Sequence, residues 1–565
     1  MKLRTLLCAT LVCPLALVAG QGQSGPVSTA SAADIPHLRT QGTATQLIVD
    51  GQPFLALAGE LNNDSATSLD YVRRLWPRLV EAKINTVLAG VSWNQIERQE
   101  GKFDFSVLDG VIQGARSHNL RLVLLWFASW KNSLSSYPPD WVKKDFDRFP
   151  RARTKTGKTL ELLTPLSDAN RDADARAFAA LMGHVKAVDG HEHTVIMIQV
   201  ENEVGMHGDS RDHSAAADKA YAGPVPKELM DYLQQHKDTL IPEFRKAWEA
   251  AGFKTSGTWE EVFGPGAATE GIFMAWHYAR YLDRVAAAGK AQYPLPMFVN
   301  AALYGVGRTE FPPSGGRPWD LMMDVWKAGA PQIDVLAPDA YGNFTEFCAK
   351  YSRPGNPLFI PESLNGAVGA ARVLYAFGRH NAIGFSAMGA VERSSTPDTD
   401  LIGSYDLIEQ LAPLISEHQG NGTMSAVLLG PDDPPQKVQV GNYTLEVKFV
   451  KPRVAPLTQP TPIPPNTFAA GIFIATGPDE YFVAGMGIDI TFAPSTPGLP
   501  LAGLATVEEG SFVDGRWVRG RLLAGDSTEE GENIRISWPP GSWVPEYRQR
   551  ASPDAIQRVT LYRYR

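Results

Sequence analysis

The chain has 565 residues, which is more than one ordinary domain needs, so at least two domains are expected. Its formal net charge is −8 and its pI is about 5.8, which argues against nucleic acid as the main partner. Apolar residues make up 44% of the chain, enough to build large cores.

The N-terminus is typical of an export signal. Lys2 and Arg4 precede an apolar run, Leu6–Ala19, that is too short to span a membrane as a mature helix. We therefore expect residues 1–32 to be a signal peptide and leader, with a retained membrane anchor as the alternative. Only Cys348 would survive cleavage, so no internal disulfide is expected. This combination predicts an exported bacterial protein, periplasmic or extracellular, that has no membrane contact after cleavage.

The next part of the chain alternates short apolar runs with helical patterns. Such runs, apolar without alternation, are typical of buried parallel strands. Eight of them, with helical material between most, predict a (β/α)₈ TIM barrel over residues 33–415. The alternative is an open doubly wound sheet, but no Gly-rich phosphate loop follows the first run. The eight runs are 54–60, 86–93, 120–126, 195–203, 295–300, 333–338, 357–361 and 382–387.

The composition changes after about residue 420. Helical periodicity fades and short β-like runs follow, and two of them flank Asp514-Gly515, which is a hairpin turn pattern. The sequence therefore predicts an accessory all-β, sandwich-like domain over residues 420–565. Such a domain either binds glycan or braces the barrel.

Two glutamates end the fourth and seventh apolar runs, Glu203 and Glu362. The carboxyl ends of barrel strands form one rim, and strands four and seven face each other across an eight-stranded barrel. Two carboxyls that flank one bond are what glycosidic hydrolysis requires, and a retaining enzyme needs them about 5–5.5 Å apart. The structural alternatives are a capping carboxylate for Glu203 and a salt-bridged rim glutamate for Glu362.

Other polar residues lie at the same predicted rim. Asn202, beside Glu203, is suited to bonding a sugar hydroxyl next to the reacting carbon. Tyr341 is the preferred hydrogen-bond partner for Glu362. Asn300 and Glu60, at the ends of the fifth and first runs, are weaker substrate-binding candidates.

Three tryptophans lie at or just past strand ends: Trp93, Trp126 and Trp130. Indole faces stack on the C–H faces of sugars, so we expect a binding surface here, with core packing as the alternative reading. No metal or other cofactor is expected, because His191-Glu192-His193 lies in a turn and lacks the spacing of a helical zinc motif.

Several segments of the first four strands resemble glycoside hydrolase family 35, the β-galactosidases of the retaining barrel clan. By this resemblance Glu203 is the acid/base, Asn202 is the adjacent sugar contact, and Glu362 is the nucleophile by its place on strand seven. The C-terminal region looks like an accessory domain on a bacterial branch of that family. The segments are Ala58–Leu61, Asn85–Val87, Trp93–Asn94, Gly101–Phe105, Pro139–Val142 and Gln199–Glu203.

The resemblance implies a retaining exo-β-galactosidase that releases terminal galactose, and galactose side chains of a plant glycan such as xyloglucan are one hypothetical substrate. Two positions depart from the family pattern. Gly90 stands where the family has a tyrosine, and residues 126–132 replace a loop whose acid helps to hold galactose. The alternatives are therefore another clan glycosidase, such as an arabinosidase or an endo-acting enzyme, and a non-catalytic glycan-binding barrel.

Overall fold

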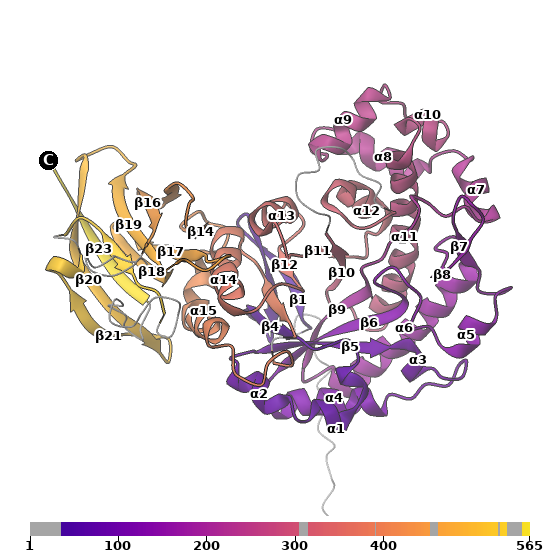
Figure 1. Cartoon of the computed structure of the whole chain (residues 1–565), viewed down its shortest axis with the longest axis horizontal. Coiled ribbons are helices and arrows are strands. Elements are labelled where there is room, and N and C mark those ends of the chain that lie inside the picture. Colours follow the sequence, from indigo (N-terminus) through magenta and orange to yellow (C-terminus); the bar gives the residue numbers. More distant parts are fainter. Residues whose placement is uncertain (1–34, 304–314, 390, 452–461, 529–530, 540–555) are drawn as a thin grey trace, which may run out of the picture.

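The computed structural model describes residues 35–303, 315–389, 391–451, 462–528, 531–539 and 556–565 (Figure 1). The predicted signal peptide and leader, residues 1–32, lie outside the described residues. Within the described part of the chain, no helix is both long enough and apolar enough to cross a membrane.

Eight parallel strands form the predicted barrel, in the order β11-β10-β9-β6-β5-β4-β13-β12. The two ends of this sheet meet through a parallel bridge between Asp339 and Glu362, and the Ala340 N–H donates to the Glu362 carbonyl at 2.8 Å. The sheet is thus nearly closed, and the (β/α)₈ prediction is confirmed. The strands are β4 (Ala56–Glu60), β5 (Thr86–Ser92), β6 (Arg121–Lys131), β9 (Val195–Asn202), β10 (Met297–Ala302), β11 (Val335–Asp339), β12 (Phe359–Ile360) and β13 (Gly384–Met388).

Helices surround the strands, and a group of them forms the long connection between β9 and β10 (Figure 1). The longest helices bury one apolar face each against the barrel wall. The helices are α1 (Leu69–Val72), α2 (Trp76–Glu81), α3 (Trp93–Ile96), α4 (Ser106–Ser117), α5 (Asp140–Lys144), α6 (Asp168–Asp189), α7 (Ala215–Tyr221), α8 (Lys227–Gln235), α9 (Pro242–Ala250), α10 (Trp259–Phe263), α11 (Ala267–Lys290), α12 (Met323–Gly329), α13 (Phe344–Tyr351), α14 (Gly366–His380) and α15 (Thr399–His418).

A small antiparallel sheet precedes the barrel and joins its inner core. Its strands are β1 (His37–Gln41), β2 (Ala44–Val49) and β3 (Gln52–Phe54). Leu47 and Val49 of β2 belong to the same apolar cluster as the inward-facing Leu88, Leu125 and Phe298. The opposite, C-terminal ends of the strands carry the polar residues described below. A short hairpin, β7 (Arg151–Arg153) and β8 (Thr159–Leu163), follows α5.

Beyond α15 the described chain is almost entirely β-structure, as the sequence predicts. One sheet has the order β14-β17-β18-β23-β20-β21 and the other β15-β16-β19-β22, with antiparallel pairing throughout. Asp514 and Gly515 form the predicted turn between β20 and β21, both with positive φ. The strands are β14 (Met424–Leu429), β15 (Gln436–Val440), β16 (Tyr443–Phe449), β17 (Ala469–Gly477), β18 (Glu480–Met486), β19 (Ile488–Pro494), β20 (Leu501–Val513), β21 (Arg516–Leu523), β22 (Ile534–Ile536) and β23 (Ile556–Tyr564).

The C-terminal strands pack against α14 and α15 on one flank of the barrel (Figure 1). Gly378 of α14 lies so close to this region that a Cβ there would be 2.7 Å from the Ala426 Cβ. Arg379 donates to the Ser425 hydroxyl at 3.2 Å, and Gln410 accepts from the Phe512 N–H at 3.0 Å. The contact is therefore both apolar and polar, and it lies away from the rim that carries the carboxyls.

Candidate active site

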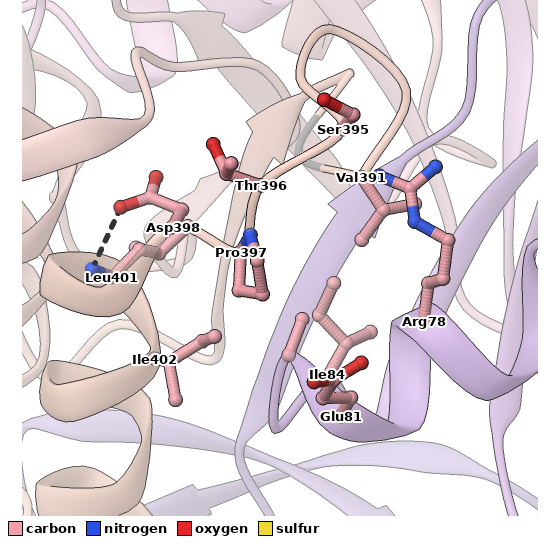
Figure 2. Close-up of a pocket in the computed structure, with 11 residues that line it drawn as sticks. Arg78, Glu81, Ile84, Val391, Ser395, Thr396, Pro397, Asp398, Leu401 and Ile402 are labelled. Carbon is pink, nitrogen blue, oxygen red and sulfur yellow. Dashed lines mark hydrogen bonds between the residues drawn. The ribbon is translucent and has the colours of Figure 1, made fainter.

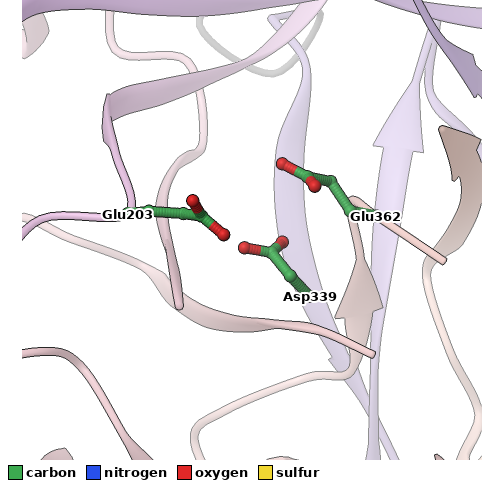
Figure 3. Close-up of side chains that lie close together, drawn as sticks. All are labelled: Glu203, Asp339 and Glu362. Carbon is green, nitrogen blue, oxygen red and sulfur yellow. The ribbon is translucent and has the colours of Figure 1, made fainter. Parts of the chain in front are cut away.

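Three carboxyl groups meet at the C-terminal rim of the barrel, those of Glu203, Asp339 and Glu362 (Figure 3). One oxygen from each lies within 4.8 Å of the others. Glu203 follows β9, Asp339 ends β11 and Glu362 follows β12. The two glutamates predicted from the sequence are thus brought together, and the structure adds an aspartate between them.

The backbone at the end of β9 separates Glu201 from Glu203. Both residues adopt left-handed conformations, with φ of 61° and 46°, which non-glycine residues rarely do and which often mark functional sites. The strand therefore loses its regular alternation here. Glu203 joins the rim carboxyls, whereas the Glu201 carboxylate accepts from the backbone N–H groups of Ser129 and Trp130 at 2.9 and 2.7 Å.

Glu201 is paired instead with Asp174 of α6, and both are fully buried. Burial, followed by the charge of Asp174, raises the pKa of Glu201 well above its ordinary value. The Asp174 carboxylate also accepts from the Ser129 hydroxyl at 2.6 Å and from the Trp126 indole at 2.9 Å. This buried pair fixes the end of β6 and does not face the rim carboxyls.

Glu203 has the environment of a protonated acid. Burial, then the negative charge of Glu362, raises the pKa of Glu203, while Lys131 and a hydrogen bond from Asp339 act in the opposite direction. Two nearby carboxyls with different environments are the arrangement that separates an acid from a base.

Asp339 is held between its neighbours. Asn300 of β10 donates to Asp339 Oδ2 at 2.9 Å, and the same Asn300 accepts from the Glu203 N–H at 2.9 Å. Burial and the negative charges of Glu362 and Glu203 raise the pKa of Asp339 well above its ordinary value. Asp339 therefore favours its neutral form, in which it can donate to Glu203.

Glu362 accepts a 2.7 Å hydrogen bond from the Tyr341 hydroxyl, as predicted from the sequence. Burial and the Glu362 charge raise the pKa of Tyr341, so it remains a donor at neutral pH. The Tyr341 carbonyl in turn accepts from Arg372 at 3.0 Å, and a second nitrogen of Arg372 bonds the Ala340 carbonyl at 3.0 Å. This arginine fixes the loop that presents the tyrosine.

Glu60, Lys131 and Asn202 add a polar wall to the site. Lys131 Nζ donates to Asn202 Oδ1 at 2.8 Å. Burial, then the charge of Glu362, raises the pKa of Glu60 well above its ordinary value, and Lys131 partly offsets this. Among the described residues, Glu60 Oε1 and Asn202 Nδ2 are buried without a hydrogen-bond partner. Buried polar atoms of this kind are suited to bind a polar ligand.

The three tryptophans predicted to stack on sugars do not lie at an accessible surface. Trp93, Trp126 and Trp130 are each 0% exposed. Trp126 packs on Phe178 of α6, and Trp130 packs on Tyr281 of α11, because their strand parity points them outward from the barrel. Their indole N–H groups bond Glu97, Asp174 and the Leu163 carbonyl. The three tryptophans are therefore core residues, which is the alternative that the sequence left open. Their buried positions do not fit the predicted stacking on sugars.

Asp339 and Lys131 were not among the residues predicted from the sequence. Asp339 ends an apolar strand in the same way as the two glutamates, and that pattern could have identified it. Three carboxylate oxygens at this spacing could ligate a hard cation.

Gly90 lies where an inward-facing side chain would point into the barrel. A Cβ there would lie 2.7 Å from the Phe127 ring and 2.8 Å from the Asn63 carbonyl. Phe127 packs on Tyr137, with ring centroids 5.3 Å apart, and Lys131 Nζ is 5.0 Å from the Phe127 ring. Phe127 therefore fills the space that a larger residue at position 90 would need.

A separate pocket lies between α2 and residues 391–402 (Figure 2). Asp398 at its edge accepts from the Leu401 and Gly366 N–H groups at 3.2 and 2.6 Å. Its carboxylate thus caps α15 and fixes the loop, and the pocket is lined by apolar side chains such as Ile84 together with polar ones such as Arg78 and Glu81. The rim of the barrel remains the candidate active site.

Comparisons with known proteins match parts of the chain. A family model described as a β-galactosidase, that of glycoside hydrolase family 42, matches residues 69–283, and a domain of unknown function (DUF5597) matches residues 401–535. The first match includes Glu203 and ends before Glu362. The second begins within α15 and covers most of the C-terminal strands. Neither match reaches half of the chain.

Two curated relatives are β-galactosidases. The chain is 31% identical to that of Xanthomonas manihotis over 227 residues, which cover 38% of this chain and 33% of the relative. It is 26% identical to that of an Arthrobacter species over 212 residues, which cover 35% of this chain and 28% of the relative. The chain therefore matches about a third of the length of these relatives.

Solved structures of β-galactosidases also resemble this one. That from Bacillus circulans sp. alkalophilus has a TM-score of 0.44 at 16% identity, and the match covers 64% of this chain and 57% of the other. That from Marinomonas ef1 has a TM-score of 0.42 at 14% identity, with 65% and 60% covered.

Proposed function

We propose that this protein is a retaining exo-β-galactosidase. The observation that carries the proposal is the close approach of Glu203 and Glu362, with oxygens within 4.8 Å of each other at the C-terminal rim of a (β/α)₈ barrel. A retaining glycosidase needs carboxyls about 5–5.5 Å apart, whereas an inverting one leaves about 6.5–9.5 Å for a water. The partial matches to β-galactosidases support the same reaction class.

The two glutamates take different roles in this mechanism. Ionised Glu362, held by Tyr341, attacks the anomeric carbon while Glu203 gives its proton to the glycosidic oxygen. The bond from that carbon to the leaving oxygen breaks, and its electron pair stays on the oxygen. A covalent glycosyl ester of Glu362 results. Glu203 then takes a proton from water, the water oxygen attacks the same carbon, and the ester electrons return to Glu362.

The raised pKa of Glu203 supports its role as the acid, since its proton is retained to higher pH. Asn202 and Glu60 supply buried polar atoms for the sugar hydroxyls. The choice of exo action rests on the resemblance of the sequence motifs to family 35.

The finer parts of the proposal rest on the sequence. The motifs between residues 58 and 203 resemble family 35, whereas the family model that matches residues 69–283 is that of family 42, and both describe β-galactosidases. The N-terminal segment favours export from a bacterium, where galactosylated plant glycans such as xyloglucan are accessible substrates. On these grounds we also propose a family and a natural substrate, in addition to the reaction class.

A panel of aryl β-glycosides tests the proposal, with Glu362→Ala alongside. We expect the galactoside to be cleaved fastest, and Glu362→Ala to lower kcat/KM by at least roughly 10³-fold because the nucleophile is lost. Glu249→Ala, at an exposed position on α9, is the matched control and should retain wild-type activity.

The first sugar product, observed by NMR, tests the stereochemistry. We expect the β-anomer to appear first, and an initial α-anomer would contradict the retaining mechanism. Cleavage of a different glycoside alone would overturn the choice of galactose. If neither aryl glycosides nor galactosylated xyloglucan oligosaccharides were cleaved, the catalytic proposal would be wrong and a glycan-binding barrel would remain.

A further inference from the structure

The ammonium group of Lys131 determines how the amide of Asn202 is oriented. Lys131 Nζ donates to Asn202 Oδ1 at 2.8 Å, Lys131 is 8% exposed and Asn202 is 0% exposed. An ammonium group has three donors and no acceptor, so it must face the oxygen of the amide and not its nitrogen. The amide orientation therefore follows from the identity of residue 131.

The backbone holds Lys131 in this position. Lys131 pairs with Asn202 in the β6–β9 register, and the Asn132 N–H donates to the Asn202 carbonyl at 3.2 Å. The chain then turns back, with reciprocal bonds between Lys131 and Leu134 of 2.8 and 3.0 Å. The Phe127 ring, 5.0 Å from Nζ, covers the ammonium group. Lys131 is thus fixed at both its backbone and its side chain.

With Oδ1 occupied, Asn202 Nδ2 is the free end of the amide. It is buried, and no described residue accepts a hydrogen bond from it. Asn202 directly precedes Glu203, the proposed acid/base, at the rim of the barrel. A buried donor that stays unpaired beside the reacting groups is suited to a ligand acceptor.

We propose that Lys131 is a positioning residue that orients Asn202 so that Nδ2 donates to the hydroxyl on the sugar carbon next to the anomeric carbon, the 2-hydroxyl. The inference rests on the proposed glycosidase function. A hydrogen bond to the 2-hydroxyl strengthens in the transition state, so a fixed donor contributes to rate. Lys131 contributes by excluding the flipped amide, whose oxygen would face the sugar.

A competing explanation is that Lys131 only balances acidic charge. Glu60 and Glu203 both lie within its electrostatic influence, and Glu362 adds to the negative charge of the site. In that case removal of the ammonium group would affect all substrates alike. The two explanations therefore differ in whether the effect of Lys131 requires a 2-hydroxyl on the substrate.

The test compares 4-nitrophenyl β-galactoside with its 2-deoxy analogue. We expect the wild-type protein to favour the galactoside by roughly 10⁴-fold in kcat/KM, because a site built to bond a hydroxyl rejects the analogue without it. Lys131→Met keeps the side-chain length and removes the ammonium group. We expect it to reduce that ratio by about 10- to 100-fold.

Asn202→Asp tests the same hydrogen bond independently, in case Lys131→Met folds poorly. Thermal unfolding will show whether each variant is folded. The carboxylate that this substitution introduces still accepts from Lys131 but cannot donate, so the same ratio should fall. In the double variant the ratio should fall no further than in Asn202→Asp alone, because both changes remove one interaction.

Other outcomes would overturn the inference. If Lys131→Met slows both substrates equally, or neither, Lys131 does not act through the 2-hydroxyl. If the ratio in Asn202→Asp is that of the wild-type protein, Nδ2 is not the donor. Failure of the wild-type protein to cleave any glycoside would instead overturn the proposed function, and the inference with it.

Discussion

Glu203 and Asp339 face each other across β10, and Asn300 of that strand bonds both of them. Its amide oxygen accepts from the Glu203 N–H, and its amide nitrogen donates to Asp339 Oδ2, each at 2.9 Å. Figure 3 shows the two carboxyl groups directed toward one another. Because burial keeps a proton on Asp339, this residue can donate to Glu203 and stabilise its ionised form.

This pairing predicts the alkaline limit of activity. Catalysis needs protonated Glu203, so activity falls as pH rises through its pKa. The hydrogen bond from Asp339 lowers that pKa, so Asp339→Leu should shift the alkaline limb of kcat/KM upward by roughly one pH unit. Asp339→Asn keeps a donor toward Glu203 and should shift it much less. A downward shift in both variants would mean that Asp339 is ionised in the native protein.

The Glu201–Asp174 pair predicts a pH-dependent stability. Glu201→Ala would leave the buried Ser129 and Trp130 N–H groups without an acceptor and would remove one hydrogen-bond partner of Asp174, so it should lower the free energy of unfolding by about 3–5 kcal/mol. In Glu201→Gln a neutral amide of similar shape replaces the protonated acid. The free energy of unfolding should therefore fall by no more than about 1 kcal/mol. Urea denaturation measures both.

The sign of the pH effect follows from the raised pKa of Glu201. Its contribution is fully present below the ordinary value of 4.5 and diminishes as pH rises toward the folded-state pKa. The wild-type protein should therefore lose stability as pH rises above about 4.5, and Glu201→Gln should lose less. The exposed Glu249→Gln serves as control, and an identical slope in both variants would contradict the prediction.

We expect substitutions at Gly90 and Phe127 to have non-additive effects on the free energy of unfolding. Gly90→Ala places a Cβ 2.7 Å from the Phe127 ring and should destabilise the fold by about 1–3 kcal/mol through overpacking. Combined with Phe127→Leu, the total loss should be smaller than the sum of the two single losses. Gly183→Ala in α6, where the nearest atom would be 3.7 Å away, is the control and should be neutral or stabilising. Strict additivity would show that Phe127 does not limit position 90.

Tyr341→Phe tests the bond to Glu362. It removes the 2.7 Å donor from the proposed nucleophile and should lower kcat by roughly 10- to 100-fold, with the unfolding temperature little changed. Tyr71→Phe also removes a tyrosine hydroxyl that bonds a glutamate, but at a 45% exposed position, so its kcat should remain that of the wild-type protein. Equal kcat in wild-type and Tyr341→Phe proteins would remove Tyr341 from the mechanism.

The barrel could be predicted because each of its strands is encoded locally. Runs such as 195–200 are apolar on both faces, which occurs where a parallel strand is covered by helices outside and by the core inside. The positions of Glu203 and Glu362 follow from the same pattern, since each ends such a run. The Tyr341–Glu362 bond was predicted from the place of Tyr341 just past the end of a strand and is confirmed.

What the sequence alone determined is the set of strands, their order along the chain and the acids at their ends. The direction of each side chain at the rim was decided by the tertiary structure, because backbone irregularities there break the alternation on which such predictions depend. The left-handed Glu201 and Glu203 send one acid to α6 and the other to the site. Asp339 joins the carboxyls only when β11 meets β12 as the barrel closes.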